Sequence, residues 1–476
     1  MLLPTRRVSI GRFERTLRRH AATHIRTSNE NVCVSLRNLW PTPMAPDLGA
    51  QRLVAFRARL PDDLTMRPPT PRSLSCLLTL SAAIVAAGCG DDATSDAGAG
   101  GISADGGTDV LSEATSDTSG EDAPPEASPD ATEEDGAIGD ASVDATLDTA
   151  KLQQMLAEAL PDAPAGVDGI SLVVHDAQDR RVIELTVGDF ATDRRVPVAS
   201  ASKLVTGLVL LRLVEEGTLH MTDTPGEVLG WTGTTAATAT LDHLGAFVSG
   251  ISPDALCIYR PMVTLQQCAA EIGALDPLAA PGERFDYGGT HQAVAAAMAE
   301  VVTGQAWAAL FDAKLKTPLG LASPDLRYVT LPKQGTGEQN PLVAGGLLAT
   351  ADEYMSMLAV LFHKGKVDGE SWISPSVIER FGENLYTGAV IGETPMGAIG
   401  LDFHYGWSSW LNCEGAVASC EVVSSPGAYG FSPWVDWETG YYAVLAMESD
   451  EPGAGSEFSA PLMEAVRAEI EGLLGP

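Results

Sequence analysis

The sequence predicts an α+β domain with a mostly antiparallel sheet built from both ends of the domain, flanked by helices and joined to a helical lobe. Apolar, β-branched runs occur near the start of the domain and again near the end of the chain, and helical patterns broken by Pro and Gly fill the interval. Only residues 148–476 are apolar enough over a long enough stretch to bury a large core.

The expected elements follow in order along this domain. Residues 148–160 form an amphipathic helix, because Leu152, Leu156 and Leu160 share one face. Two apolar runs then form a hairpin, and a long apolar helix begins near residue 199 and ends at Gly217. The remaining helices are expected at 291–303, 307–315, 350–363 and 374–381, the late strands at 421–425, 429–437 and 441–448, and the last helix from Ser459, with Pro461 in its first turn, to Leu474.

The charge is distributed unevenly before this domain. Residues 1–65 hold 11 Arg against five acidic residues and show no helical or strand period, so we interpret them as a non-native or disordered N-terminal extension, with translation starting at Met66. Residues 90–147 are rich in Asp, Ala, Gly, Ser and Thr and lack large apolar side chains. Such a segment cannot bury enough surface to offset its ordering entropy, so it is expected to be an acidic disordered linker.

Residues 66–89 resemble a lipoprotein signal peptide. Arg67 and Arg72 precede an apolar run at 74–87 that is too short to span a membrane. The run ends in small residues followed by Cys89, a pattern similar to a bacterial lipobox, in which the cysteine is lipidated. The expected product is an exported, membrane-anchored lipoprotein of the bacterial cell envelope; the alternative is an ordinary secretory signal with a chance cysteine.

Four cysteines remain after the signal, at positions 257, 268, 413 and 420. Outside the cytoplasm their short separations favour the pairs Cys257–Cys268 and Cys413–Cys420. A four-thiolate zinc site is the competing interpretation, although the paired C-x-x-C spacing typical of such sites is missing. We expect no metal, nucleotide or redox cofactor. The formal charge of −33 also argues against a nucleic-acid partner.

The chemistry is indicated by Ser200 and Lys203, which share a face at the start of the long apolar helix. A serine hydroxyl needs a nearby base to become a nucleophile, and a partly buried lysine can lose its proton near neutral pH. The start of a helix also favours negative charge. The alternative is a purely structural role, in which Ser200 caps the helix and the side chain of Lys203 extends into solvent.

Together with its surroundings this pair resembles the serine β-lactamase and penicillin-binding-protein superfamily, in particular the class C β-lactamase-related branch. Residues 196–203 and 211–217 resemble the family's nucleophile helix, and 280–287 resemble its second motif, usually Tyr-x-Asn. Residues 240–250, 344–352 and 405–407 resemble further family segments, so that the likeness covers nearly all of 151–476.

The resemblance implies a role for each matched residue. Ser200 attacks the substrate carbonyl, Lys203 takes or relays its proton, and Tyr287 acts as general base or as proton donor to the leaving group. The backbone N–H groups of Ser200 and Ala428 form the oxyanion hole. Glu283 and Asp286 are expected to be surface or loop-capping carboxylates, and His291 and His404 to be packing residues.

Two positions depart from the family's pattern. The second motif ends in Gly289 in place of Asn, and the third, usually Lys-Thr-Gly or His-x-Gly, aligns with residues 425–427, so that Ser425 replaces a cation and Gly427 is kept. Gly289, Ser425 and Gly427 are the expected substrate-binding positions, with Ser424 as a further neutral donor. The missing cation weakens the case for β-lactams and D-alanyl-D-alanine peptides, which carry a carboxylate.

The sequence therefore predicts an exported serine hydrolase that acts through an acyl-enzyme on a small-molecule or peptide ester or amide, with esters favoured. A catalytically inactive binding protein with the same fold is the alternative. An unrelated α/β-hydrolase would need a G-x-S-x-G elbow, and a metal hydrolase would need an H-x-H or H-E-x-x-H spacing; the sequence contains none of these motifs.

Overall fold

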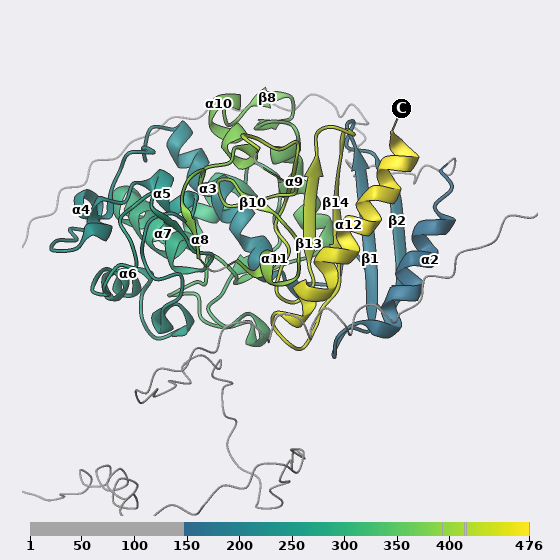
Figure 1. Cartoon of the computed structure of the whole chain (residues 1–476), viewed down its shortest axis with the longest axis horizontal. Coiled ribbons are helices and arrows are strands. Elements are labelled where there is room, and N and C mark those ends of the chain that lie inside the picture. Colours follow the sequence, from purple (N-terminus) through teal and green to yellow (C-terminus); the bar gives the residue numbers. More distant parts are fainter. Residues whose placement is uncertain (1–146, 393, 414, 416, 476) are drawn as a thin grey trace, which may run out of the picture. The chain divides into compact units, whose positions relative to one another are not determined.

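The computed structural model describes residues 147–476, apart from positions 393, 414, 416 and 476 (Figure 1). The predicted extension at 1–65, the signal with Cys89 and the acidic linker up to residue 146 lie outside the described residues.

A seven-stranded sheet contains strands from both ends of the domain, in the order β10-β11-β12-β13-β14-β1-β2. Each neighbouring pair is antiparallel. The first strand pairs with the last, with Val173 opposite Val444, which confirms the predicted meeting of the two ends. The strands are β1 (Gly169–Asp176), β2 (Arg181–Gly188), β10 (His404–Tyr405), β11 (Trp410–Leu411), β12 (Val422–Ser424), β13 (Ser432–Asp436) and β14 (Tyr441–Ala446).

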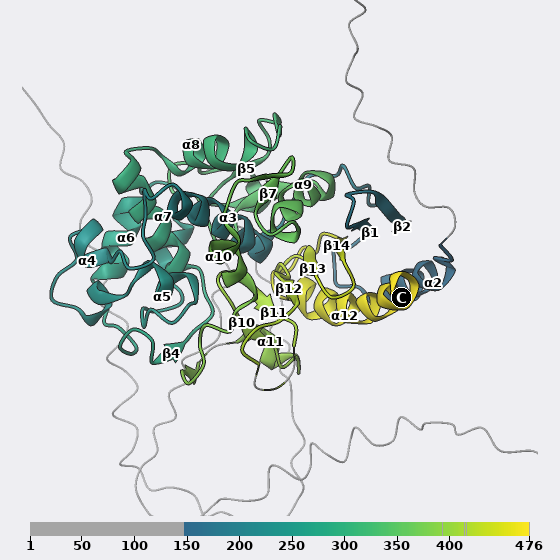
Figure 2. The same cartoon turned by 90° about the horizontal axis from the view of Figure 1, so that it is seen from above.

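The helices occupy most of the predicted ranges. Figures 1 and 2 show α4, α5, α6 and α8 gathered around α7 in a lobe beside the sheet. The helices are α2 (Ala150–Ala159), α3 (Ser202–Glu215), α4 (Pro225–Val228), α5 (Leu241–Gly245), α6 (Leu265–Gly273), α7 (Thr290–Thr303), α8 (Trp307–Phe311), α9 (Ala351–Phe362), α10 (Pro375–Ile378), α11 (Pro395–Ala398) and α12 (Ala454–Leu474).

Helices cover both faces of the sheet because successive strand residues point in opposite directions. Leu172 and Val174 of β1 pack beneath α2 and α12, whereas Val173 joins the larger core that contains α3, α7 and α9. Figure 1 shows α12 lying across β13, β14 and β1. The larger core, on the face of Val173, joins the sheet to the helical lobe. Helix α3 lies within this core and is therefore buried along almost its whole length.

The structure contains several short strands that the sequence did not predict, and β3 and β4 among them precede the nucleophile and the tyrosine. They are β3 (Val196–Pro197), β6 (Leu347–Ala349) and β5 (Arg327–Tyr328) in one sheet, β4 (Arg284–Phe285) beside β9 (Val390–Ile391), and the hairpin of β7 (Lys366–Val367) and β8 (Glu370–Ser371). Strands of two or three residues are too short to produce a period-2 pattern.

The predicted start of the last helix is wrong. Helix α12 begins at Ala454, so that Pro461 lies inside the helix and not in its first turn. The close approach of Gly455 to the 428–430 loop fixes this start, since a Cβ at Gly455 would lie 2.3 Å from the Tyr429 carbonyl carbon. Strand β13 likewise begins only at Ser432, after a turn in which Gly430 has a φ of 105°.

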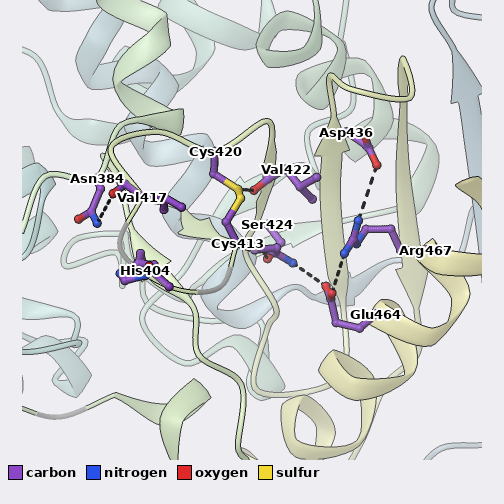
Figure 3. Close-up of a disulfide and its surroundings, with 12 residues drawn as sticks. Asn384, His404, Cys413, Val417, Cys420, Val422, Ser424, Asp436, Glu464 and Arg467 are labelled. Carbon is purple, nitrogen blue, oxygen red and sulfur yellow. Dashed lines mark hydrogen bonds and ion pairs between the residues drawn. A yellow bond between two sulfur atoms is a disulfide. The ribbon is translucent and has the colours of Figure 1, made fainter.

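Both predicted disulfides are present. Cys257 and Cys268 lie 5.2 Å apart between their Cα atoms and connect the turn at Leu256–Tyr259 to α6. Cys413 and Cys420, 6.0 Å apart, close the loop between β11 and β12 (Figure 3). Both pairs fit an oxidising compartment.

No single helix of the described chain has both the length and the apolar character needed to cross a membrane; α7 and the Trp307–Lys316 segment pass such a test only together, and they are bent by 83°.

Truncation of the core between α12 and the sheet tests the observed layers. Leu445 of β14 is fully buried, so we expect Leu445→Ala to lower the free energy of unfolding by about 2–5 kcal/mol. Leu256→Ala, at a side chain that is 79% exposed, is the matched control and should change it by less than about 0.5 kcal/mol. Urea denaturation measures both, and equal losses would contradict the layer assignment.

Candidate active site

The serine lies where a strand turns directly into a buried helix. Strand β3 ends at Pro197, Ala199 has a positive φ of 47°, and a 3₁₀ turn at Ala199–Ala201 leads into α3. A left-handed backbone is unfavourable for alanine and occurs where the surrounding structure forces it. Here it leaves Ser200 partly exposed while its neighbours are buried.

Lys203 is the closest base to this serine. Its Nζ lies 3.1 Å from Ser200 Oγ and 2.9 Å from the carbonyl oxygen of Ala344. The side chain is only 4% exposed. Burial lowers the pKa of Lys203 to about 7, although the negative charge of Asp254 opposes this shift. A large fraction of the lysine is therefore a neutral amine at neutral pH, with a lone pair that can accept the serine proton.

Tyr287 closes the other side of the pair. Lys203 Nζ lies 4.7 Å from the centre of its ring, and the ring stacks on Trp410 at 4.8 Å. Burial raises the pKa of Tyr287 to about 12, while an interaction with the Ser200 hydroxyl opposes the shift. The phenol is therefore protonated in the resting site. This favours the proton-donor role for Tyr287 over the general-base role, and it leaves Lys203 as the base.

The segment after β12 forms the wall facing the nucleophile. Ser425 is almost fully buried, and its hydroxyl donates a 2.8 Å hydrogen bond to the Ser200 carbonyl oxygen. A Cβ at Gly427 would lie 2.2 Å from the Val198 carbonyl oxygen, so only glycine fits there. The carbonyl of Ala428 accepts a 2.9 Å hydrogen bond from Gly453 N–H, which holds the loop at the start of α12.

Two of the expected substrate-binding positions, Ser425 and Gly427, lie against the segment of the nucleophile, and both have a visible packing task. Ser425 supports the nucleophile's backbone and Gly427 permits close approach. Ser424 was expected as a substrate donor, and this expectation is wrong. Its hydroxyl donates to Asn412 Oδ1 at 2.6 Å, at the start of the polar chain through Glu464 to Arg467 in Figure 3.

Gly289 lies at the N-terminal end of α7, two residues after Tyr287. A Cβ at this position would lie 2.9 Å from Ile258 Cδ1, so the asparagine side chain of the family's motif would require the Ile258 side chain to shift. Ile258 is buried and follows the disulfide-bonded Cys257. An apolar side chain therefore stands close to where relatives present an amide.

Two sequence expectations about neighbouring residues have opposite outcomes. Asp286 is only 2% exposed and pairs with Arg284 at 2.6 and 2.9 Å, so its assignment as a surface or loop-capping carboxylate is wrong. The carboxylate of Glu283 does cap the loop, at 3.3 Å from Ala280 N.

His291 is a packing residue as predicted: it is buried between Ser249 Oγ and the Asp286 carbonyl, each at 2.8 Å. His404, the first residue of β10, lies beside the disulfide loop in Figure 3, and its Nδ1 is 3.0 Å from Tyr386 OH, which agrees with a packing role.

Sequence reasoning missed two side chains near the lysine. Gln292 is buried on α7 and donates to the Lys203 carbonyl at 2.8 Å and to Ser408 at 2.9 Å. Asp254 acts on Lys203 through its charge. Neither occupies a patterned position, so only the three-dimensional arrangement reveals them. Within the described residues, no three His, Cys, Asp or Glu side chains are grouped so that they could hold a metal ion.

Comparisons with known proteins show the family and the fold. The family model Beta-lactamase matches residues 156–467. A "putative beta-lactamase from Bacteroides dorei DSM 17855" is 25% identical, with a TM-score of 0.59 over 68% of this chain and 99% of that one. EstCE1, a hydrolase with promiscuous acyltransferase activity, is 19% identical (TM-score 0.52; 67% and 98% covered). A penicillin-binding protein homologue from Caulobacter crescentus is 20% identical (TM-score 0.51; 66% and 96%). No curated protein matches.

The depressed pKa of Lys203 predicts an acid limb in the pH profile. The base must be neutral, so kcat/KM for an uncharged ester should fall about tenfold per pH unit below about pH 7 and level off above it. Initial rates between pH 5 and 9 measure this limb. A profile that is flat through this range, or one that still rises tenfold per pH unit up to pH 9 without levelling off, would contradict a Lys203 that is neutral at pH 7.

Proposed function

Because this chain belongs to the beta-lactamase family, we propose that it is a serine hydrolase that forms an acyl-enzyme on Ser200. The observation that carries the proposal is a buried lysine amine, 3.1 Å from the hydroxyl of a partly exposed serine at the head of a buried helix. A structural lysine would place its ammonium in water or beside a carboxylate.

The reaction follows from the arrangement. The neutral amine of Lys203 takes the Ser200 proton as Oγ attacks the substrate carbonyl carbon. The N–H groups of Ser200 and Ala428 stabilise the oxyanion. The proton then passes from Lys203 through the Tyr287 phenol to the leaving oxygen or nitrogen as its bond to carbon breaks. Water adds to the acyl-enzyme carbonyl with Lys203 accepting its proton, and cleavage of the acyl bond returns a proton to Ser200.

We propose uncharged or cationic esters and amides as substrates, with esters favoured over β-lactams and D,D-peptides. Ser425 offers a neutral hydroxyl where related enzymes place a cation, and that hydroxyl is already bonded to the nucleophile's backbone. Asp254 adds a negative charge whose field reaches Lys203. The missing cation and the negative charge of Asp254 both disfavour a substrate that carries a carboxylate.

The second candidate function is a ligand-binding protein without turnover. The replacement of the motif's asparagine by Gly289 favours it, because the site lacks the amide that relatives present to the substrate. The geometry of Ser200, Lys203 and Tyr287 argues against it, since three polar side chains would be brought together for no reaction.

Removal of the nucleophile distinguishes the two candidates. Ser200→Ala should lower kcat/KM for p-nitrophenyl acetate by about a thousandfold or more, because no other oxygen can form the acyl-enzyme. Ser376→Ala, at an exposed serine, is the matched control and should keep full activity. Undiminished turnover in the Ser200→Ala variant would refute the hydrolase. If the wild-type protein and the Ser200→Ala variant are both folded and neither hydrolyses the ester, the result would favour the ligand-binding protein.

We also propose that the protein is exported and anchored to the cell envelope through a lipid on Cys89. The lipobox-like sequence before Cys89 and the acidic segment after it support this proposal, as do two disulfides in the folded domain.

The anchor predicts a defined mature N-terminus. Mass spectrometry of the membrane fraction should find the N-terminal peptide starting at a diacylglyceryl-modified Cys89. Cys89→Ser should abolish this processing, whereas Cys76→Ser within the signal should not. Peptides from residues 1–65 still attached to the mature protein would refute the assignment.

A further inference from the structure

The hairpin of β10 and β11 contains a family-like segment that the proposed reaction does not use. Tyr405 of β10 is paired directly opposite Trp410 of β11, and Trp410 is in turn paired opposite Ser424 of β12. Ser424 precedes Ser425, whose hydroxyl donates to the Ser200 carbonyl oxygen at 2.8 Å. Trp410 is therefore a direct strand neighbour of the segment that faces the nucleophile.

The turn of this hairpin is bound to the helix that carries the lysine. Ser408 has a positive φ of 67°, and its hydroxyl accepts a 2.9 Å hydrogen bond from the side-chain amide of Gln292. The same amide donates to the Lys203 carbonyl oxygen at 2.8 Å. On the other side of the turn, Trp407 N–H donates to the Arg380 carbonyl oxygen at 3.0 Å. These bonds hold the hairpin in a fixed position relative to the site.

Two aromatic rings of the hairpin pack against the candidate proton donor. The Tyr287 ring lies 4.8 Å from the Trp410 ring and is inclined to it by only 27°. Tyr405 meets Tyr287 edge-on, at 5.8 Å and 81°, and contacts Trp410 at 4.9 Å. Trp410 and Tyr405 are each only 1% exposed, and Lys203 Nζ lies 4.7 Å from the centre of the Tyr287 ring. Because buried rings are closely packed, Tyr287 has little room to turn.

The indole N–H of Trp410 is the polar group nearest to this packing. It is buried, and it forms no hydrogen bond of normal geometry with any residue that the structure describes. It nevertheless acts on Tyr287: burial raises the pKa of the phenol, and the Ser200 hydroxyl and the Trp410 N–H group both oppose this rise. A buried donor without a partner is costly, so its place beside a proton-transferring phenol calls for an explanation.

We propose that Trp410 is a positioning residue for protonation of the leaving group: its ring holds Tyr287 in place, and its N–H donates to the phenolate oxygen that forms when Tyr287 gives up its proton. This inference rests on the proposed function and adds to it the residue that supports the proton donor.

The proton transfer explains why the donor is needed. As the bond from the carbonyl carbon to the leaving oxygen breaks, its electron pair goes to that oxygen, which takes the phenol proton of Tyr287. The phenolate persists until the protonated amine of Lys203 passes on the proton that it took from Ser200. A hydrogen bond to a charged acceptor is stronger than one to a neutral acceptor, so Trp410 stabilises this step more than the resting site. The alternative is that Trp410 only fills the aromatic core beside Phe285.

Two acetate esters that differ by one methylene group test the proposal. p-Nitrophenoxide leaves without a proton, whereas the alkoxide of p-nitrobenzyl alcohol needs one. Both esters form the same acetyl-enzyme, so the ratio of their kcat/KM values compares acylation alone. Trp410→Phe keeps an aromatic ring and removes the N–H. We expect it to lower kcat/KM for p-nitrobenzyl acetate about tenfold more than kcat/KM for p-nitrophenyl acetate.

Trp434→Phe is the matched control. Trp434 is also a fully buried tryptophan of the sheet, and its N–H donates to Tyr441 OH at 3.1 Å in the core beneath α12. This variant should leave the ratio of the two esters unchanged.

Each other outcome has one meaning. Equal losses on both esters in Trp410→Phe, or an unchanged ratio, would overturn the proposal, because a purely structural role affects both esters alike. The same selective loss in Trp434→Phe would overturn it too. Hydrolysis of p-nitrophenyl acetate that survives Ser200→Ala would instead refute the hydrolase itself.

If the wild-type protein hydrolyses neither ester, 3-fluorotyrosine incorporated at position 287 decides the matter. Its phenol is titrated by fluorine NMR, and Trp410→Phe should raise its pKa, because the N–H that stabilises the phenolate is lost. An unchanged or lowered pKa would overturn the proposal. If Trp410→Phe does not fold, 3-benzothienylalanine at position 410 keeps the shape of the indole and replaces the N–H by sulfur, and the same results are expected of it.

Discussion

The candidate site depends on the exclusion of water from a single amine. Lys203 lies on a helix that is buried along almost its whole length, between the sheet and the helical lobe. Its charged form loses hydration there, and neither Ser200 nor the Ala344 carbonyl can replace that hydration fully. The neutral form is therefore stabilised, and a residue that is ordinarily a cation becomes a base beside a serine hydroxyl.

This arrangement lowers the stability of the fold. The folded pKa of about 7 lies below the ordinary value of 10.5, so the unfolded chain binds an additional proton between these two values. Stability therefore falls as the pH is lowered through that window and is then constant with respect to this group. Each pKa unit corresponds to about 1.4 kcal/mol, so the cost at neutral pH is several kcal/mol. The large core around α3 must offset it.

The sequence was sufficient to predict the sheet that joins both ends, the long buried helix and both disulfides, since period, length and cysteine spacing are local signals. It was also sufficient to place Ser200, Lys203 and Tyr287 together through their motifs. It could not place the start of α12, because a contact of Gly455 with a loop distant in sequence determines it. Ser424 was misassigned for a similar reason, since its hydroxyl donates a hydrogen bond to Asn412, which lies in the loop between β11 and β12.

The departures from the family's motifs acquire a physical meaning in the structure. A Cβ at Gly289 would lie 2.9 Å from Ile258 Cδ1, so an apolar side chain adjoins the position of the lost amide. Ser425 offers only a neutral hydroxyl in place of a cation, and this hydroxyl is bonded to the Ser200 carbonyl oxygen. Both departures concern groups that would contact the substrate, and they leave the relation of Lys203 to Ser200 intact.

The most direct test of the central claim is covalent labelling with a fluorophosphonate, which reacts only with an activated serine. Intact-mass and peptide analysis should find one adduct per molecule, on Ser200, formed faster as the pH rises through about 7 and lost in the near-isosteric variant Lys203→Met. An unlabelled wild-type protein, an adduct on another residue, or equal labelling of Lys203→Met would contradict activation of Ser200 by a buried, neutral Lys203.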